Sequence, residues 1–195
     1  MTGRDGIPLE RRRLLAGLGA GTIAGLAGCV GGDDDEDDEL EDRTFEPNVE
    51  HPGDEPIEFT DDQHCVVCNM TPSDYPNRKS QLAHENGEGA VACSPGCFAA
   101  YYAATASDSE IVGAWTTEID SGNLIDATDG YFVLVTEEDP ADAHMGGDPR
   151  PFARYGDAVD FLEEWDAEEL SEEDDVVELE GIDRDVAMIY RASRL

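Results

Sequence analysis

The sequence predicts an α+β fold in which two small, related strand-strand-helix (ββα) units follow a disordered acidic tether. Two features of the 195-residue chain point to it. Short runs with strand-like composition are followed by a helix-like segment at two places, and turn residues separate the runs. A stretch dense in Asp and Glu and poor in apolar residues precedes both units, and such a composition disfavours folding.

The first unit is predicted over residues 55–107. The segment "PIEFTD" alternates enough to form a short strand, and "SQLAHENGEGAVACS" predicts two strands joined at Asn86-Gly87, a residue pair that favours tight hairpin turns. Ser94 and Pro95 form a typical helix start, because serine caps free N–H groups and proline suits the first helical position. The helix continues through "GCFAAYYAATAS".

The second unit is predicted over residues 108–195. Strands are expected in "IVGAWTTEID" and "YFVLVTE", followed by a short strand at residues 151–155. Residues 157–165 are predicted to be a helix because apolar side chains recur there at helical spacing. The acidic segment after this helix is expected to be surface loop and edge structure, and "DVAMIYRAS" is expected to be a last strand or a short helix.

Acidity dominates the composition. The chain has 47 Asp and Glu against 12 Lys and Arg, which gives a formal net charge of −35. Such a surface repels phosphate backbones, so no nucleic-acid partner is expected. Because salt screens the repulsion between like charges, the excess is typical of a halophilic protein whose surface is adapted to high salt.

The N-terminal residues 1–28 have the pattern of a signal peptide. Arg11-Arg12-Arg13, followed by a short run of Leu, Ala and Gly, resembles a twin-arginine export signal. The "LAGC" that ends at Cys29 resembles the lipobox of a lipoprotein, which implies that lipid is attached to this cysteine. These resemblances imply a protein anchored by lipid to the outer face of the cytoplasmic membrane, with residues 29–54 as a flexible acidic linker.

Four further cysteines lie in two close pairs. Cys65 and Cys68 are spaced C-x2-C, and Cys93 and Cys97 are spaced C-x3-C. Two such pairs match a structural Zn(II) site. Two disulfides are an alternative outside the reducing cytosol, and Cys97 could instead be a small buried apolar residue.

The segment "CVVCNM" also suits a softer metal. Cu(I) prefers thiolate and thioether ligands and does not require the closed tetrahedron of zinc sites. In an extended segment Cys68 and Met70 would project to one side and could hold one ion together, with His64 and Cys65 as neighbouring candidates. Methionine alone is most often a core residue, and its closeness to two thiols is what favours the metal here.

Together, "CVVCNM", "ACSPGCFAAYY" and "AHMGGDPRPFARYGDAVDFL" resemble the NosL family of exported lipoproteins. The resemblance implies an α+β fold of two ββα units, Cu(I) binding, and a chaperone that supplies copper to nitrous oxide reductase or another copper-accepting protein. Carried over by position, it implies that the metal ligands are Cys68, Met70 and Met145, with Cys65 and His64 as further partners. His144, Cys93 and Cys97 are additional candidates.

Two alternatives remain at this stage. One is a module stabilised by Zn(II) on the four cysteines, and the other is a thiol-disulfide oxidoreductase that uses Cys65 and Cys68. The latter is disfavoured because no clear helix follows this pair, and a helix N-terminus normally lowers the pKa of the attacking thiol. No nucleophile with a matching base stands out, so the sequence predicts no catalytic residue and no enzyme.

Overall fold

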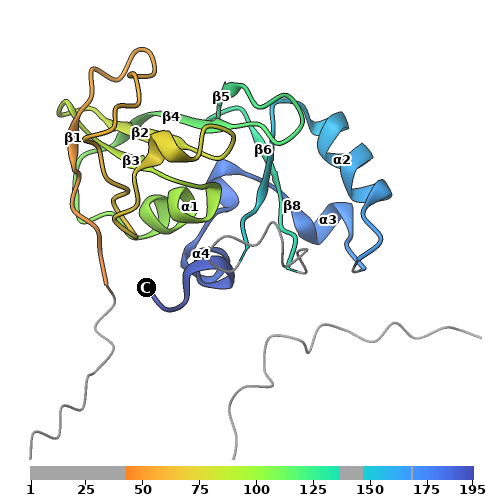
Figure 1. Cartoon of the computed structure of the whole chain (residues 1–195). Helices are drawn as coiled ribbons and strands as arrows, with labels where there is room; N and C mark the ends of the chain where they lie inside the picture. Colours follow the sequence, from red (N-terminus) through yellow and green to blue (C-terminus); the bar gives the residue numbers. More distant parts are fainter. Residues whose placement is uncertain (1–42, 137–146, 168) are drawn as a thin grey trace, which may run out of the picture. The chain divides into compact units, whose positions relative to one another are not determined.

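The computed structural model describes residues 43–136, 147–167 and 169–195 (Figure 1). The predicted signal peptide, the lipid-bearing Cys29, His144 and Met145 lie outside the described residues. Within the described ranges, none of the helices has the length and apolar character needed to cross a membrane.

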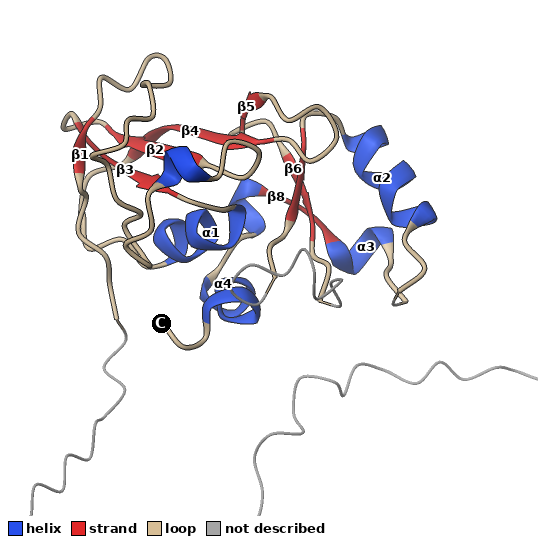
Figure 2. Cartoon of the chain, viewed as in Figure 1, coloured by secondary structure: helices blue, strands red, loops and turns tan. Residues whose placement is uncertain are grey.

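A five-stranded antiparallel sheet forms the larger layer (Figure 2). Its centre is the predicted hairpin around Gly87, which has the positive φ of 86° that such a turn requires. The strand order is β1-β3-β2-β4-β5. The strands span β1 Val49–Glu50, β2 Ser80–His84, β3 Glu88–Ala92, β4 Ile111–Thr117 and β5 Leu124–Asp126.

Helix α1 (Pro95–Ala103) begins directly after β3 and packs against β2, β3 and β4. Its start is the one predicted: Ser94 is the N-cap, its hydroxyl accepts from the Cys97 N–H, and Pro95 occupies the first helical position. Residues 95–101 are all buried, because α4 (Arg184–Arg191) lies against α1 on the side away from the sheet (Figure 1). A helix enclosed in this way is apolar all round.

A second, three-stranded antiparallel sheet has the strand order β7-β6-β8. Helix α2 packs on β6 and β7, and its Phe161 packs against Phe152 and Trp165 in a small second core. The elements span β6 Tyr131–Val133, β7 Arg150–Phe152, α2 Tyr155–Glu164, α3 Glu172–Asp175 and β8 Val176–Glu178. Short 3-10 turns occupy Pro72–Asp74 and Leu179–Gly181.

The α+β class is confirmed, and the order strand, strand, helix occurs in β2-β3-α1 and again in β6-β7-α2. The sheets, however, do not divide at residue 107. Strands β4 and β5 extend the first sheet, because β4 pairs with β2 over residues 80–84. The segment "DVAMIYRAS" forms helix α4 and packs on α1.

Two N-terminal segments differ from the expectation. Residues 49–50, assigned above to the flexible linker, pair with β3, and His51 is buried with its ring stacked on Trp115 at 5.1 Å between centroids. The segment "PIEFTD" forms no strand. The backbone N–H and C=O of Ile57 bond instead to the side-chain amide of Gln81, so a side chain takes the place of a neighbouring strand.

Candidate metal centre

The C-x2-C segment folds as a tight turn. The Asn69 N–H donates to the Cys65 carbonyl at 2.9 Å, and the Cys65 N–H donates to the Met70 carbonyl at 2.7 Å. Asn69 has a positive φ of 66°, which asparagine tolerates better than most residues. The chain is therefore not extended between Cys68 and Met70, and the expectation that alternation places their side chains on one side does not apply.

The other pair of cysteines lies where β3 passes into α1. Cys93 follows the last residue of β3, and Cys97 is in the first turn of α1. The Val66 N–H donates to the Val91 carbonyl at 2.9 Å, which joins the C-x2-C turn to β3 near Cys93. One strand thus brings both cysteine pairs together.

The four cysteine sulfurs form one cluster, with all Sγ atoms within 4.8 Å of one another. The Sγ atoms of Cys68 and Cys93 are 3.3 Å apart, and those of Cys93 and Cys97 are 3.9 Å apart. All four residues are free thiols, since a disulfide would need about 2.05 Å. Thiolates around a tetrahedral Zn(II) at about 2.3 Å lie about 3.8 Å apart, so the cluster is also close to the geometry of a metal site.

Contacts among the thiols make them chemically unequal. Hydrogen bonds from Cys65 and Cys93 lower the pKa of Cys68. The contact with Cys68 raises the pKa of Cys65, but those with Cys93 and Cys97 outweigh it and lower that pKa to about 7. The hydrogen bonds of Cys93 with Cys65, Cys68 and Cys97 raise its pKa, so Cys93 keeps its proton. The contact with Cys65 raises the pKa of Cys97, but those with Cys68 and Cys93 outweigh it and lower that pKa. The cluster thus favours thiolate at Cys65, Cys68 and Cys97 rather than at Cys93, and thiolate is the form that binds metal.

A buried charged network touches the cluster on the α1 side. The Arg191 side chain from α4 is 1% exposed, and its Nε donates to Cys97 Sγ at 3.2 Å. Its Nη2 forms an ion pair with Asp148 at 2.7 Å, and Arg78 bonds to the same carboxylate. Burial lowers the pKa of Arg191, but the neighbouring Cys97 and Asp148 outweigh it and raise that pKa. The guanidinium is therefore charged.

The remaining predicted ligands lie differently. Met70 is 37% exposed, and its Sδ accepts a hydrogen bond from the Tyr75 hydroxyl at 3.4 Å. His64 is exposed and does not belong to the cluster, although its carbonyl accepts from the Asn48 side chain at 2.6 Å. His144 and Met145 are outside the described residues, but Gly147, which follows them, has its carbonyl bonded to Arg191 at 2.8 Å.

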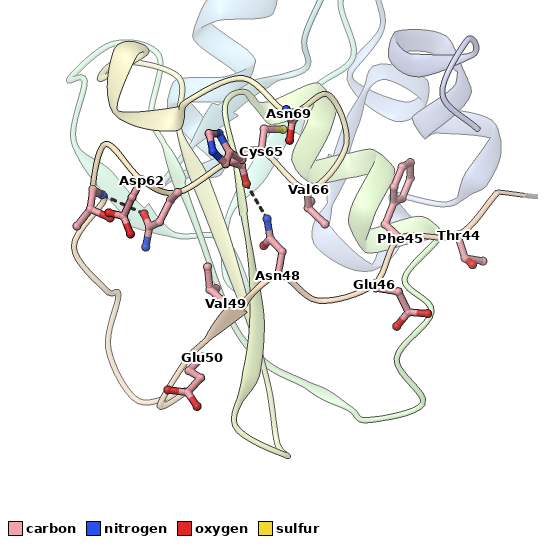
Figure 3. A pocket seen from close by; sticks show the side chains of 13 residues that line it. Thr44, Phe45, Glu46, Asn48, Val49, Glu50, Asp62, Cys65, Val66 and Asn69 are labelled. Carbon is pink, nitrogen blue, oxygen red and sulfur yellow. Dashed lines mark hydrogen bonds between the residues drawn. The ribbon is translucent and has the colours of Figure 1, made fainter.

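A surface cavity of about 750 Å³ lies beside the C-x2-C turn. Figure 3 shows Cys65 and Asn69 at one end of the group of lining residues and Val49 and Glu50 at the other. Three acidic residues line it: Glu46, Glu50 and Asp62. Of the four clustered cysteines, Cys65 lines this acidic hollow, although the residue is buried.

A family model described as NosL matches residues 56–178, more than half of the chain. The chain belongs to the NosL family. The structure is similar to the crystal structure of the copper chaperone NosL from Shewanella denitrificans, with a TM-score of 0.53 and 15% sequence identity over 67% of this chain and 97% of that chain. At that identity the similarity shows the fold alone. The comparison with curated proteins gave no match.

The NosL match ends at residue 178, before α4, which carries Arg191. No sequence pattern identifies Arg191 as a partner of Cys97, or Asp148 and Arg78 as members of the same charged network. Ser94 was recognised as a helix cap, but not as a partner of Arg191, to which it is bonded at 2.7 Å. An acidic side chain is expected near the N-terminus of a helix such as α1, but no local pattern identifies Asp148 as that side chain.

Proposed function

We propose that this NosL-family protein is an extracytoplasmic, lipid-anchored Cu(I)-binding chaperone. The observation that carries the proposal is the cluster of four free thiols, three of them with lowered pKa values, one of which, Cys65, borders an open hollow. Thiolate is the ligand that Cu(I) prefers, and a site near the surface suits an ion that must be passed on. The solved copper chaperone of the same family and fold adds support.

Cys68 and Met70 are the proposed point of exchange. Cys68 is half-buried while the other three cysteines are buried, and Met70 is 37% exposed two residues later. A thiolate supplies affinity, whereas a neutral thioether binds Cu(I) weakly and can be displaced by a ligand of the acceptor. Met145 is a further proposed ligand. The contact of Gly147 with Arg191, which also touches Cys97, supports its inclusion.

Zinc is the second candidate. The specific observation that favours it is the number of thiols together with their separation, since four cysteines within 4.8 Å suit a closed structural site. A zinc site of this kind would be resident and would stabilise the fold, and Met70 would not take part. The two candidates therefore differ in what the methionines do.

An anaerobic titration separates them. Reduced protein is titrated with Cu(I) and with Zn(II) against chelators of known affinity. For a copper chaperone we expect tight Cu(I) binding that Cys68→Ser and Met70→Ala each weaken about tenfold or more. Met188→Ala is the matched control, because Met188 is 44% exposed on α4 and should change nothing. Tight binding of one equivalent of Zn(II), together with no effect of Met70→Ala on metal affinity, would reject the copper function in favour of a zinc site.

The proposed setting follows from the N-terminal pattern. Export by the twin-arginine route and lipid on Cys29 would hold the protein at the outer face of the cytoplasmic membrane, in a halophilic organism. Nitrous oxide reductase, or another copper-accepting protein, is the proposed acceptor, and no catalysis is proposed. Transfer is checked by mixing Cu(I)-loaded protein with copper-free acceptor and measuring copper on each after separation.

A further inference from the structure

All three nitrogens of the buried Arg191 guanidinium donate hydrogen bonds. Its Nη1 donates to the carbonyls of Gly147 and Tyr190, at 2.8 and 2.7 Å, and its Nη2 donates to Ser94 Oγ and to Asp148, both at 2.7 Å. These bonds leave Nε directed at Cys97 Sγ, 3.2 Å away. A side chain held at both terminal nitrogens presents this third donor in a fixed direction.

The same guanidinium also fixes the backbone of its sulfur partner. Ser94 Oγ, which accepts from Arg191, accepts in turn from the Cys97 N–H at 3.3 Å. Cys97 is therefore tied to Arg191 through its backbone and its sulfur. Asp148 accepts from the Gly96 N–H at 2.8 Å, so Ser94, Gly96 and Cys97 at the start of the helix are all bonded to the Arg191–Asp148 pair.

Metal on the cluster would give this contact a function. Two thiolates with Cu(I) carry one negative charge, and four with Zn(II) carry two, in a place where Cys93 and Cys97 are buried. Buried negative charge is unfavourable unless a positive partner or a donor accompanies it. A charge-assisted N–H bond to a ligand sulfur meets that need and orients the ligand at the same time.

We propose that Arg191 is a positioning residue for the metal centre, which orients Cys97 and stabilises its metal-bound sulfur through the Nε–H bond. This inference rests on the proposed function only in that metal binds the cysteine cluster. It does not depend on which metal binds, and the residue comes from a helix outside the matched NosL segment.

The test compares Arg191→Lys with Arg184→Lys on the reduced full-length protein. Lysine keeps the charge but loses the planar fork, so it cannot hold Asp148 and donate to Cys97 in the same geometry. Arg184 lies on the same helix, and its guanidinium donates to the backbone carbonyls of Arg43 and Leu195. We expect Arg191→Lys to weaken Cu(I) binding about 10- to 100-fold and Arg184→Lys to leave it unchanged.

A second readout separates positioning from a general loss of structure. Co(II) bound by thiolates gives a sulfur-to-metal charge-transfer band, which should shift in Arg191→Lys and stay in place in Arg184→Lys. In a Cys97→Ser background the effect of Arg191→Lys on affinity should disappear, because the two changes act through one bond. An unshifted band, or an undiminished affinity loss in that background, would overturn the proposal.

If Arg191→Lys does not fold, an NMR measurement on the wild-type protein tests the proposal. On addition of Cd(II), the Arg191 Nε–H proton resonance should shift and that of Arg184 should not. An unmoved Arg191 resonance rejects the proposal. If the wild type binds Co(II) or Zn(II) but not Cu(I), the copper function fails. The Co(II) band still tests Arg191.

Discussion

A methyl group added at Gly96 should damage the protein in a way that the same change at Gly156 does not. Both glycines are the second residue of a helix, α1 and α2, and neither has a positive φ. At Gly96 a Cβ would lie 2.6 Å from Asp148 Oδ1 and 2.7 Å from Arg191 Cζ, whereas at Gly156 nothing lies within 4 Å. The two positions therefore share their helix context and differ in their surroundings.

The magnitudes follow from that difference. Alanine in place of glycine favours a helix by up to about 1 kcal/mol, which should leave Gly156→Ala neutral or slightly more stable. At Gly96 the neighbouring atoms cannot move freely, because Arg191 and Asp148 are both bonded and buried. Overpacking of this kind costs about 1–3 kcal/mol, so Gly96→Ala should be the less stable variant.

Guanidinium chloride unfolding under reducing conditions, followed by circular dichroism, gives the free energy of unfolding for both variants. Equal stability of Gly96→Ala and Gly156→Ala would refute the account of a filled space at the start of α1. A loss of stability at Gly96 without any change in metal affinity would show that the Asp148–Arg191 pair supports only the fold.

Two further predictions concern stability. Burial raises the pKa of Tyr101 to about 12, against about 10 in an unfolded chain. The folded state holds the Tyr101 proton more tightly than the unfolded chain does. The free energy of unfolding therefore includes this contribution in full below pH 10 and falls by about 3 kcal/mol as the pH rises from 10 to 12. Unfolding of the wild type and Tyr101→Phe across this range checks it, and parallel pH curves would contradict it. A chain starting at residue 55 should be about 2–3 kcal/mol less stable than one starting at residue 43, because it lacks His51 on Trp115; equal denaturation midpoints would count against that packing.

Local chemistry made the first ββα unit predictable. Asn86-Gly87 and Ser94-Pro95 each specify a turn or a helix start through their own backbone preferences, and both features are where the sequence predicted them. Strand β1 was missed because two residues show no periodicity, and the acidic composition around them favoured a linker. Its place depends on the stacking of His51 on Trp115, 64 positions further along the chain, which no local pattern encodes.

The candidate site was predictable in part for the same reason. The spacings C-x2-C and C-x3-C place each pair within reach of one ion, and four cysteines suggested a common site before any fold was known. The turn at Asn69 and the burial of Cys97 beside Arg191 depend on contacts between distant segments. A single arginine in an amphipathic helix has many possible partners, so its contact with a thiol could not be read from spacing.

The bond between Arg191 and Cys97 joins residues 94 positions apart. During synthesis from the N-terminus, all four cysteines are made long before the guanidinium that braces one of them. A chain in which α4 has not yet docked would hold its thiols without that brace, and with part of α1 uncovered. Completion of the metal centre would then report that folding has finished, so an ion bound with full affinity would mark a mature molecule.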